Sequence, residues 1–281
     1  MNWQEEFRPG SDEGLDEVRR LFKPLAALSG RLAMIVGEFP PLDVYKTEEG
    51  ALLVMEAAGM DVDKVELSAR LNEFEIRGDR EVEAGSHGFS PVRVERFHGP
   101  FQRALELPFY IDEEKIRAEY KDGILRVLMK SCMLPRDDLV LVKPKVHGKK
   151  EAKMQELPGG THSCLEDNVV QGETRLPSCD IMEDRSAYLL CVDLPGVRQE
   201  NLDIAATDDS VTIYGEPGQV ESGNGSDLDL TYGECESGAY GRTFRLSAEV
   251  DGSGVSYCLE DGLLKVRLPK RVIRPDFRKI N

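Results

Sequence analysis

The sequence predicts an all-β protein: two tandem antiparallel β-sandwiches of immunoglobulin-like type, preceded by a short helical N-terminal arm. Three observations support this prediction. The chain repeats itself once over the length of a domain, and each copy is a series of short apolar segments. Gly, Pro and Asp-Gly turns, rather than long helical patterns, separate these segments.

The repeat consists of two blocks of similar sequence. The matched segments, each with its later counterpart, are 55–60 and 192–197, 74–78 and 211–215, 99–103 and 238–242, and 122–127 and 261–266. An offset of 137 separates Gly59 from Gly196, and an offset of 139 separates Asp122 from Asp261, so two residues were inserted between the blocks. Because the period is about a whole domain, and not the 20 to 50 residues of a solenoid repeat, one folding unit has been duplicated.

The repeat divides the chain into five parts. They are an arm at 1–39, a first sandwich at 40–130, a linker at 131–175, a second sandwich at 176–270 and a short tail at 271–281. In the arm, apolar residues recur at three- and four-residue steps from Leu15 to Val36, which predicts an amphipathic helix. Pro24 and Gly30 weaken it, so the helix is either continuous or broken, and it either folds back on the first domain or forms a detachable apolar arm.

Each sandwich is predicted to contain short strands in the same order. In the first sandwich the predicted strands are 51–57, 65–69, 74–76, 101–107, 116–120 and 124–128. A tight turn at Asp122-Gly123 joins the last two. In the second sandwich, 255–259 carries apolar residues in the same phase as 116–120, and a slip of one residue would destroy this agreement.

Composition excludes several classes of function. The net charge of −16 argues against nucleic acid or an anionic membrane as a partner. No stretch approaches the roughly 20 apolar residues of a membrane span, and we expect a cytoplasmic protein.

The six cysteines are not duplicated with the repeat, which favours reduced thiols, and His162-x-Cys164 lacks the second pair that a zinc site needs. The repeats share no nucleophile placed with a base, so neither an enzyme nor a cofactor is predicted.

Three motifs of the first repeat carry a resemblance to a known family. They are Glu95-Arg96-Phe97-His98-Gly99-Pro100-Phe101-Gln102-Arg103, Leu107-Pro108 and Ala118-Glu119-Tyr120-Lys121-Asp122-Gly123-Ile124-Leu125. In this order they resemble the α-crystallin domain of small heat-shock proteins. The second repeat keeps Gly238, Arg242 and the Asp-Gly-Leu-Leu of 261–264. It departs from the family where Arg96 becomes Cys235, Pro108 becomes Ser247 and Ala118 becomes Tyr257.

The resemblance implies an ATP-independent chaperone, a holdase, that binds unfolding proteins and prevents their aggregation. A sandwich with open edges offers unfolding chains both backbone pairing and an apolar surface. An alternative is a cochaperone or adaptor of the CS-domain type that acts on one specific partner. The Gly-x-Phe-x-Arg strand, the long loop after residue 79 and the Leu-x-Leu element favour the holdase interpretation.

The resemblance also implies which residues act. A groove for clients or for a tail motif is expected at Val65, Leu67, Ala69, Ile116, Ala118 and Tyr120, and its copy at Leu202, Ile204, Val255, Tyr257 and Leu259. The linker element Leu139-Val140-Leu141-Val142 stands where the family has its docking motif. Leu139 and Leu141 form one spaced pair and Val140 and Val142 the other, and the element either docks in a groove or packs locally.

The loop from Asp79 to Val94 resembles the strand that bacterial-type members exchange to form a dimer. Its apolar residues are Phe89, Val92 and Val94, and its counterpart is 216–233. Arg103 and Arg242 match a family arginine that pairs with acidic groups at the dimer interface. We expect self-association by strand exchange: an intramolecular pseudo-dimer, a dimer of two chains, or a larger oligomer.

Overall fold

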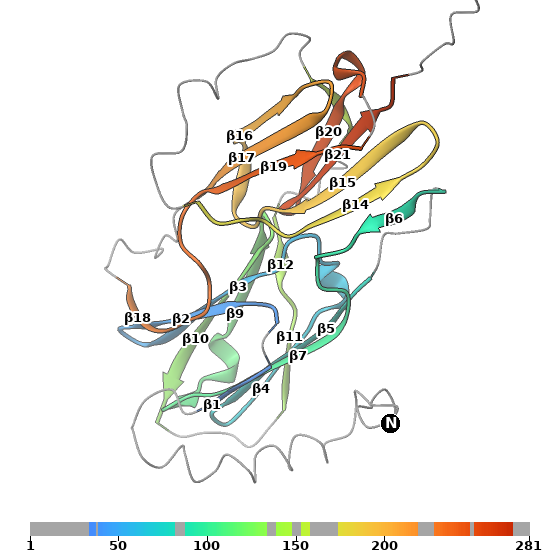
Figure 1. The fold of residues 1–281 in the computed structure, drawn as a ribbon. Helices are drawn as coiled ribbons and strands as arrows, with labels where there is room; N and C mark the ends of the chain where they lie inside the picture. The colour runs from blue at the N-terminus through green and yellow to red at the C-terminus, as the bar shows by residue number, and fades with distance from the viewer. Residues whose placement is uncertain are drawn as a thin grey trace, which may run out of the picture. The chain divides into compact units, whose positions relative to one another are not determined.

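The structure, a computed structural model, describes residues 34–37, 39–81, 88–133, 139–147, 153–157, 174–218, 228–247 and 250–271. These residues form β-strands, turns and short 3-10 turns, and this part of the chain contains no α-helix (Figure 1). The predicted all-β class with two sandwiches is confirmed. Within the ranges given above, the structure has no helix long and apolar enough to cross a membrane.

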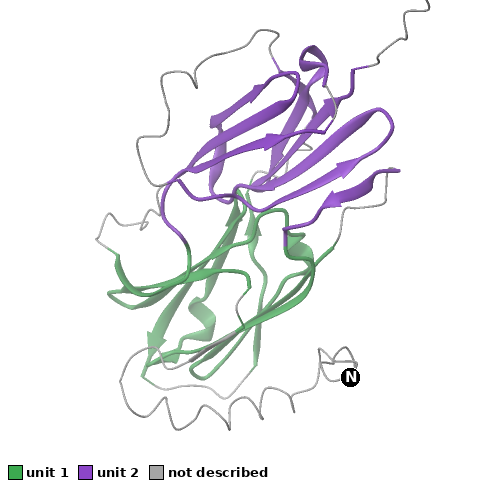
Figure 2. Ribbon diagram, in the orientation of Figure 1, with its two compact units in different colours: residues 1–82, 97–148, 220–235 green, residues 83–96, 149–219, 236–281 purple. Residues whose placement is uncertain are grey.

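The chain forms two compact units that do not simply follow the two repeats (Figure 2). Unit 1 contains residues 1–82, 97–148 and 220–235, and unit 2 contains residues 83–96, 149–219 and 236–281. A segment of the first repeat therefore belongs to unit 2, and a segment of the second repeat belongs to unit 1.

Unit 1 is built from two sheets. Its strands are β1 (Met34–Val36), β2 (Leu42–Thr47), β3 (Gly50–Glu56), β4 (Glu66–Arg70), β5 (Glu73–Arg80), β7 (Gly99–Glu106), β8 (Tyr110–Ile111), β9 (Arg117–Lys121), β10 (Ile124–Cys132), β11 (Val140–Val142), β12 (Lys145–Val146) and β18 (Asp229–Gly233). One sheet has the order β1-β7-β5-β4-β11. The other has the order β12-β9-β10-β3-β2-β18, with β8 paired to β10. The 3-10 turns η1 (Val62–Lys64) and η2 (Glu113–Lys115) precede β4 and β9.

Unit 2 repeats this plan with fewer strands. Its strands are β6 (Ser90–Arg93), β13 (Gln155–Glu156), β14 (Cys179–Glu183), β15 (Ala187–Asp193), β16 (Val197–Ala206), β17 (Ser210–Pro217), β19 (Tyr240–Arg245), β20 (Ser256–Glu260) and β21 (Leu263–Pro269). The sheet orders are β13-β20-β21-β15-β14-β6 and β16-β17-β19, and the 3-10 turn η4 (Gly252–Gly254) precedes β20.

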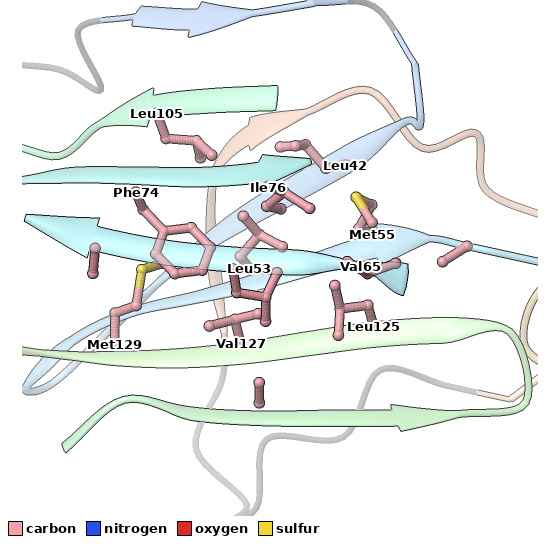
Figure 3. Packing of buried hydrophobic residues seen from close by; sticks show 14 of the residues in the cluster. Leu42, Leu53, Met55, Val65, Phe74, Ile76, Leu105, Leu125, Val127 and Met129 are labelled. Carbon is pink, nitrogen blue, oxygen red and sulfur yellow. The ribbon is translucent and has the colours of Figure 1, made fainter. Parts of the chain in front are cut away.

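Alternation of apolar residues places one face of each strand in the core. In β10, Leu125, Val127 and Met129 are fully buried, and they lie between the two sheets together with Phe74 (Figure 3). The turn before β10 has positive φ at both central residues, 51° at Asp122 and 76° at Gly123. Asp and Gly tolerate this conformation, and such a turn matches the twist of the strands that it joins.

The N-terminal arm differs from the expectation where the structure describes it. The amphipathic helix was expected to run to Val36, but Met34–Val36 form β1, which pairs antiparallel with β7 from Met34 opposite Glu106 to Val36 opposite Ala104. The helix therefore does not reach Val36. Pairing with the free edge of β7 gives these three residues backbone hydrogen bonds that periodicity does not reveal. The rest of the expected helix, residues 15–33, lies outside the described residues.

Candidate functional site: strand exchange and sheet edges

In unit 1, a strand of the second repeat extends the sheet of the first. Strand β18 pairs antiparallel with β2, with Asp229 opposite Lys46 and Gly233 opposite Asp43. The side chain of Leu228, just before β18, packs with the buried Leu52 and Val54 on the outer face of that sheet. The edge of β2 is therefore covered by residues from the counterpart loop.

An ion pair anchors the end of β18. Both terminal nitrogens of Arg103 donate to the Glu234 carboxylate at 2.8 Å, and Nη1 also donates to the Pro40 carbonyl oxygen at 2.6 Å. The Arg103 side chain is completely buried, and that of Glu234 is 21% exposed. Burial alone would raise the pKa of Glu234, but hydrogen bonds from Arg103 and Tyr232 hold that pKa below its ordinary value. The carboxylate is therefore charged at neutral pH.

A buried aspartate receives the backbone of the incoming strand. Asp43 Oδ1 accepts hydrogen bonds from the backbone N–H groups of Glu234 and Cys235, both at 2.9 Å. Its other oxygen accepts a hydrogen bond from the Tyr45 hydroxyl at 3.1 Å. Burial, and then the charge of Asp43 and the hydrogen bond to it, raise the pKa of Tyr45 to about 12, so the hydroxyl remains a donor at neutral pH.

In unit 2 the exchange occurs in the reverse direction. Strand β6, from the first repeat, pairs antiparallel with β14, with Ser90 opposite Glu183 and Arg93 opposite Ile181. Of the three apolar residues expected to act in exchange, Phe89 packs against the buried cluster that contains Met182. Val92 and Val94 are 58% and 57% exposed and add no comparable packing. Of these three residues, only Phe89 therefore helps to hold β6.

The ion pair of unit 2 has the same construction. Arg242 donates from both terminal nitrogens to the Glu95 carboxylate, and its Nη1 donates to the Pro177 carbonyl oxygen at 2.9 Å. A hydrogen bond from Arg242 lowers the pKa of Glu95, outweighing the effect of burial. Asp180 Oδ1 accepts from the backbone N–H groups of Glu95 and Arg96 at 3.0 and 3.1 Å.

The two sites correspond residue by residue through the offsets of the repeat. Arg103, Glu234, Pro40 and Asp43 of unit 1 match Arg242, Glu95, Pro177 and Asp180 of unit 2. The sequence alone offered both arginines but no acidic partners. The repeat did contain a signal for these acidic partners, because Glu95 and Glu234 recur at the offset of 139 and Asp43 and Asp180 at the offset of 137.

The sites differ in what faces the second oxygen of this aspartate. In unit 2, Arg96 is 3% exposed, its Nε donates to Asp193 Oδ1 at 2.9 Å, and its Nη1 lies 3.6 Å from Asp180 Oδ2. In unit 1 the corresponding position is Cys235. The Tyr45 hydroxyl of unit 1 contacts the Asp43 oxygen that corresponds to the one facing Arg96 in unit 2, and Met182 stands where Tyr45 would be.

The linker element lies along the edges of unit 1. Strand β11 pairs antiparallel with β4, and β12 pairs parallel with β9, so residues 140–146 connect the edges of both sheets. Val142 and Val146 pack against the core. Leu139 and Leu141 are 64% and 72% exposed. Strand β11 thus turns Val142 toward the core and Leu141 outward, and a docking role of Leu139 and Leu141 stays a prediction.

A matched pair of variants distinguishes the two faces of β11. Val142→Asp places a charge against the core, so we expect it to release β11 and lower the free energy of unfolding by about 2 kcal/mol. Leu141→Asp adds the same charge on the exposed face and is expected to change it by less than about 0.5 kcal/mol. Thermal unfolding and amide exchange of residues 66–70 measure both. Equal effects would show that the inward placement of Val142 is not what holds β11.

The residues expected to line a groove differ between the units. In unit 1, Val65, Leu67, Ala69, Ala118 and Tyr120 are at most 8% exposed, and Ile116 is partly buried. In unit 2, Val255 is buried, whereas Leu202, Ile204, Tyr257 and Leu259 are only partly buried.

Strand pairing accounts for the difference at Leu202 and Ile204, because in unit 1 β11 covers the equivalent strand β4. Strand β13 pairs with β20, and the Leu157 N–H donates to the Val255 carbonyl oxygen at 2.9 Å. No strand in the described part of the chain pairs with the outer edge of β16. The tail residues 272–281, which follow β21 as the linker follows β10, lie outside the described residues.

Both repeats resemble the sequences of known proteins. The sequence profile of the Hsp20/alpha crystallin family matches residues 43–135 and 180–281, and thus both repeats. The chain is 31% identical over 121 residues to the probable 15 kDa heat shock protein of Leptospira interrogans, a match that covers 42% of this chain and 88% of that protein. It is 33% identical over 96 residues to spore protein SP21 of Stigmatella aurantiaca, covering 34% of this chain and 56% of that protein.

Small heat shock protein C4 of Rickettsia felis is 35% identical over 95 residues, covering 34% of this chain and 57% of that protein. The chain thus spans little more than half the length of SP21 and of C4. Among solved structures, heat shock protein 16.0 from Schizosaccharomyces pombe is 28% identical and has a TM-score of 0.33, and the match covers 41% of this chain and 80% of that chain. Because the family profile matches both repeats and more than half of the chain, the protein belongs to the Hsp20/alpha crystallin family.

Proposed function

We propose that the protein is an ATP-independent holdase that binds unfolding proteins and prevents their aggregation. Membership in a family of chaperones rather than enzymes supports a chaperone role. The observation that carries the finer proposal is the edge of β16, which no described strand covers and which has partly buried Leu202 and Ile204 beside it.

The edge of β16 offers the backbone hydrogen bonds and apolar contacts that a segment of an unfolding chain has lost. A client segment in extended conformation adds as a strand to β16 through backbone hydrogen bonds, and its alternate side chains pack against Leu202 and Ile204. Selection of clients follows from exposure: a folded protein has already paired such segments, whereas an unfolding one presents them. The equivalent edge of unit 1, β4, is filled by β11, so unit 2 supplies the open edge.

The two exchange sites form the framework of the chaperone. Strands β18 and β6 cover β2 and β14, which keeps these edges from pairing with other copies at random. Exchange between repeats of one chain forms a pseudo-dimer, and tethering favours it through an effective concentration of roughly millimolar order.

Suppression of light scattering tests the chaperone activity. Without ATP and at near-stoichiometric amounts, the protein is expected to keep several unrelated heated clients in solution. Leu202→Ser with Ile204→Ser is expected to raise the concentration that halves the scattering about tenfold, because two apolar contacts are lost.

The matched control is Asn201→Ser with Ala205→Ser, at positions on the same strand that point the other way. This variant is expected to retain full suppression. No suppression by the unaltered protein at any ratio would refute the holdase proposal, and suppression of a single client only would favour an adaptor. Equal loss in the control would place client binding away from the β16 edge.

A further inference from the structure

We propose that the difference between Arg96 and Cys235 makes strand exchange heterotypic: the strand of each repeat pairs with the edge of the other repeat and not with the edge of its own kind. We call β6 and β18 the donor strands of the first and second repeat, and β2 and β14 their acceptor edges. This choice of pairing partner does not depend on chaperone activity.

The acceptor edge β14 requires a donor strand that carries a cation. The side chains of Asp180 and Asp193 are only 7% and 17% exposed, and both face the guanidinium of Arg96. Arg96 is itself supplied by the donor, three residues after β6 ends at Arg93. Two carboxylates held this close together and largely away from water are destabilising unless a cation lies with them.

The acceptor edge β2 has a different solution. The Tyr45 hydroxyl of the acceptor itself donates to Asp43 Oδ2, which corresponds to the Asp180 oxygen that faces Arg96. The donor residue here is Cys235, which brings no charge. Edge β2 therefore receives a strand without a cation, and an arginine at this position would compete with Tyr45 for the same oxygen.

Counting donors and acceptors extends the preference to the whole chain. Every chain has one donor and one acceptor of each kind. If β6 of one chain pairs with β2 of another, the β18 strands are left for the β14 edges. Cys235 would then face Asp180 and Asp193, with Met182 in the place of the tyrosine hydroxyl. Each homotypic pair of one kind thus forces the unfavourable pair of the other kind, and the two heterotypic pairs are the consistent solution.

Engineered disulfides report each pairing in the full-length chain. Ser90 lies opposite Glu183, and Asp229 lies opposite Lys46, at equivalent positions of the two registers. Ser90→Cys with Glu183→Cys, or Asp229→Cys with Lys46→Cys, reports a heterotypic pair. Ser90→Cys with Lys46→Cys reports the homotypic pair of the first repeat. Asp229→Cys with Glu183→Cys reports that of the second. Opposed strand residues lie at distances that a disulfide spans.

Each double-cysteine chain is unfolded under reducing conditions, refolded and oxidised. The cross-linked peptides are then quantified by mass spectrometry. We expect both heterotypic reporters to cross-link and the 229–183 reporter to give at least about tenfold less product. Adding Cys235→Arg to the 229–183 reporter supplies the missing cation and is expected to recover cross-linking, an effect that a purely structural role of Cys235 would not produce.

Two results would contradict heterotypic pairing. Equal yields from homotypic and heterotypic reporters would overturn the proposal. An unchanged 229–183 yield after Cys235→Arg would also overturn it, provided that the circular-dichroism spectrum of this variant remains that of a β-protein. A variant that loses this spectrum is replaced by Cys235→Lys, which supplies a cation on a more flexible side chain, and the same yield then decides.

Discussion

Arg103→Ala is expected to lower the stability of unit 1 by about 3 kcal/mol, because removal of one partner from a buried ion pair leaves the other without compensation. Arg103 is completely buried and makes hydrogen bonds to Glu234 and to the Pro40 carbonyl. The loss falls on the contact between β18 and β2, so β18 is expected to open first. Hydrogen exchange of peptides covering 42–47 and 229–234 gives the free energy of this opening.

Two matched variants accompany this change. Arg103→Lys keeps the charge but not the two parallel hydrogen bonds, so an intermediate loss is expected. Arg242→Ala removes the equivalent arginine of unit 2, whose side chain is 16% exposed and whose partner Glu95 is 30% exposed, and a smaller loss of about 1 kcal/mol is expected. If opening of β18 were as rare in Arg103→Ala as in the unaltered chain, the ion pair would not be what holds the strand.

Arg96→Ala is expected to destabilise the pairing of β6 with β14 by about 2 to 4 kcal/mol, since Asp180 and Asp193 lose the guanidinium between them. Exchange of amides in 179–183 is expected to rise while that in 42–47 stays unchanged. Adding Asp193→Asn removes one of the stranded charges and is expected to restore part of the stability, which a simple loss of packing would not allow.

Arg93→Ala provides the control on the same strand. Arg93 is 54% exposed, and its Nε lies 3.4 Å from Glu95. An exposed ion pair contributes little, so a change below about 0.5 kcal/mol is expected. Similar losses for Arg93→Ala and Arg96→Ala would mean that β6 depends on overall charge and not on the buried contacts of Arg96.

The alternation of apolar residues and the Gly, Pro and Asp-Gly turns were enough to predict the sandwiches. The strands β9 and β10 and the Asp122-Gly123 turn between them follow from local sequence. Side chains of a strand alternate between its two faces, so the spacing of apolar residues decides which side chains enter the core. The strand at Met34–Val36 was missed because its apolar spacing also fits a helix. Only the free edge of β7, a tertiary feature, distinguishes the two structures.

The partners in the candidate sites were beyond local reasoning. Glu234 lies 131 residues from Arg103 in the chain, and their contact requires that the segment 220–235 of the second repeat belong to unit 1. In the linker, four consecutive apolar residues leave the inward pair undetermined. The register of β11 on β4, set by backbone pairing, turns Val142 toward the core and leaves Leu141 in solvent.

The crossing of loops also sets an order of events during synthesis. Leu42, at the start of β2, is made 192 residues before Glu234. The Glu234 carboxylate, just after the covering strand β18, accepts a hydrogen bond from the Leu42 N–H. At about 5 to 20 residues per second, a ribosome needs roughly 10 to 40 s to make this stretch. Throughout that interval the nascent chain carries an uncovered strand that invites aggregation. During synthesis, the first repeat is thus prone to aggregate until the second repeat supplies its covering strand.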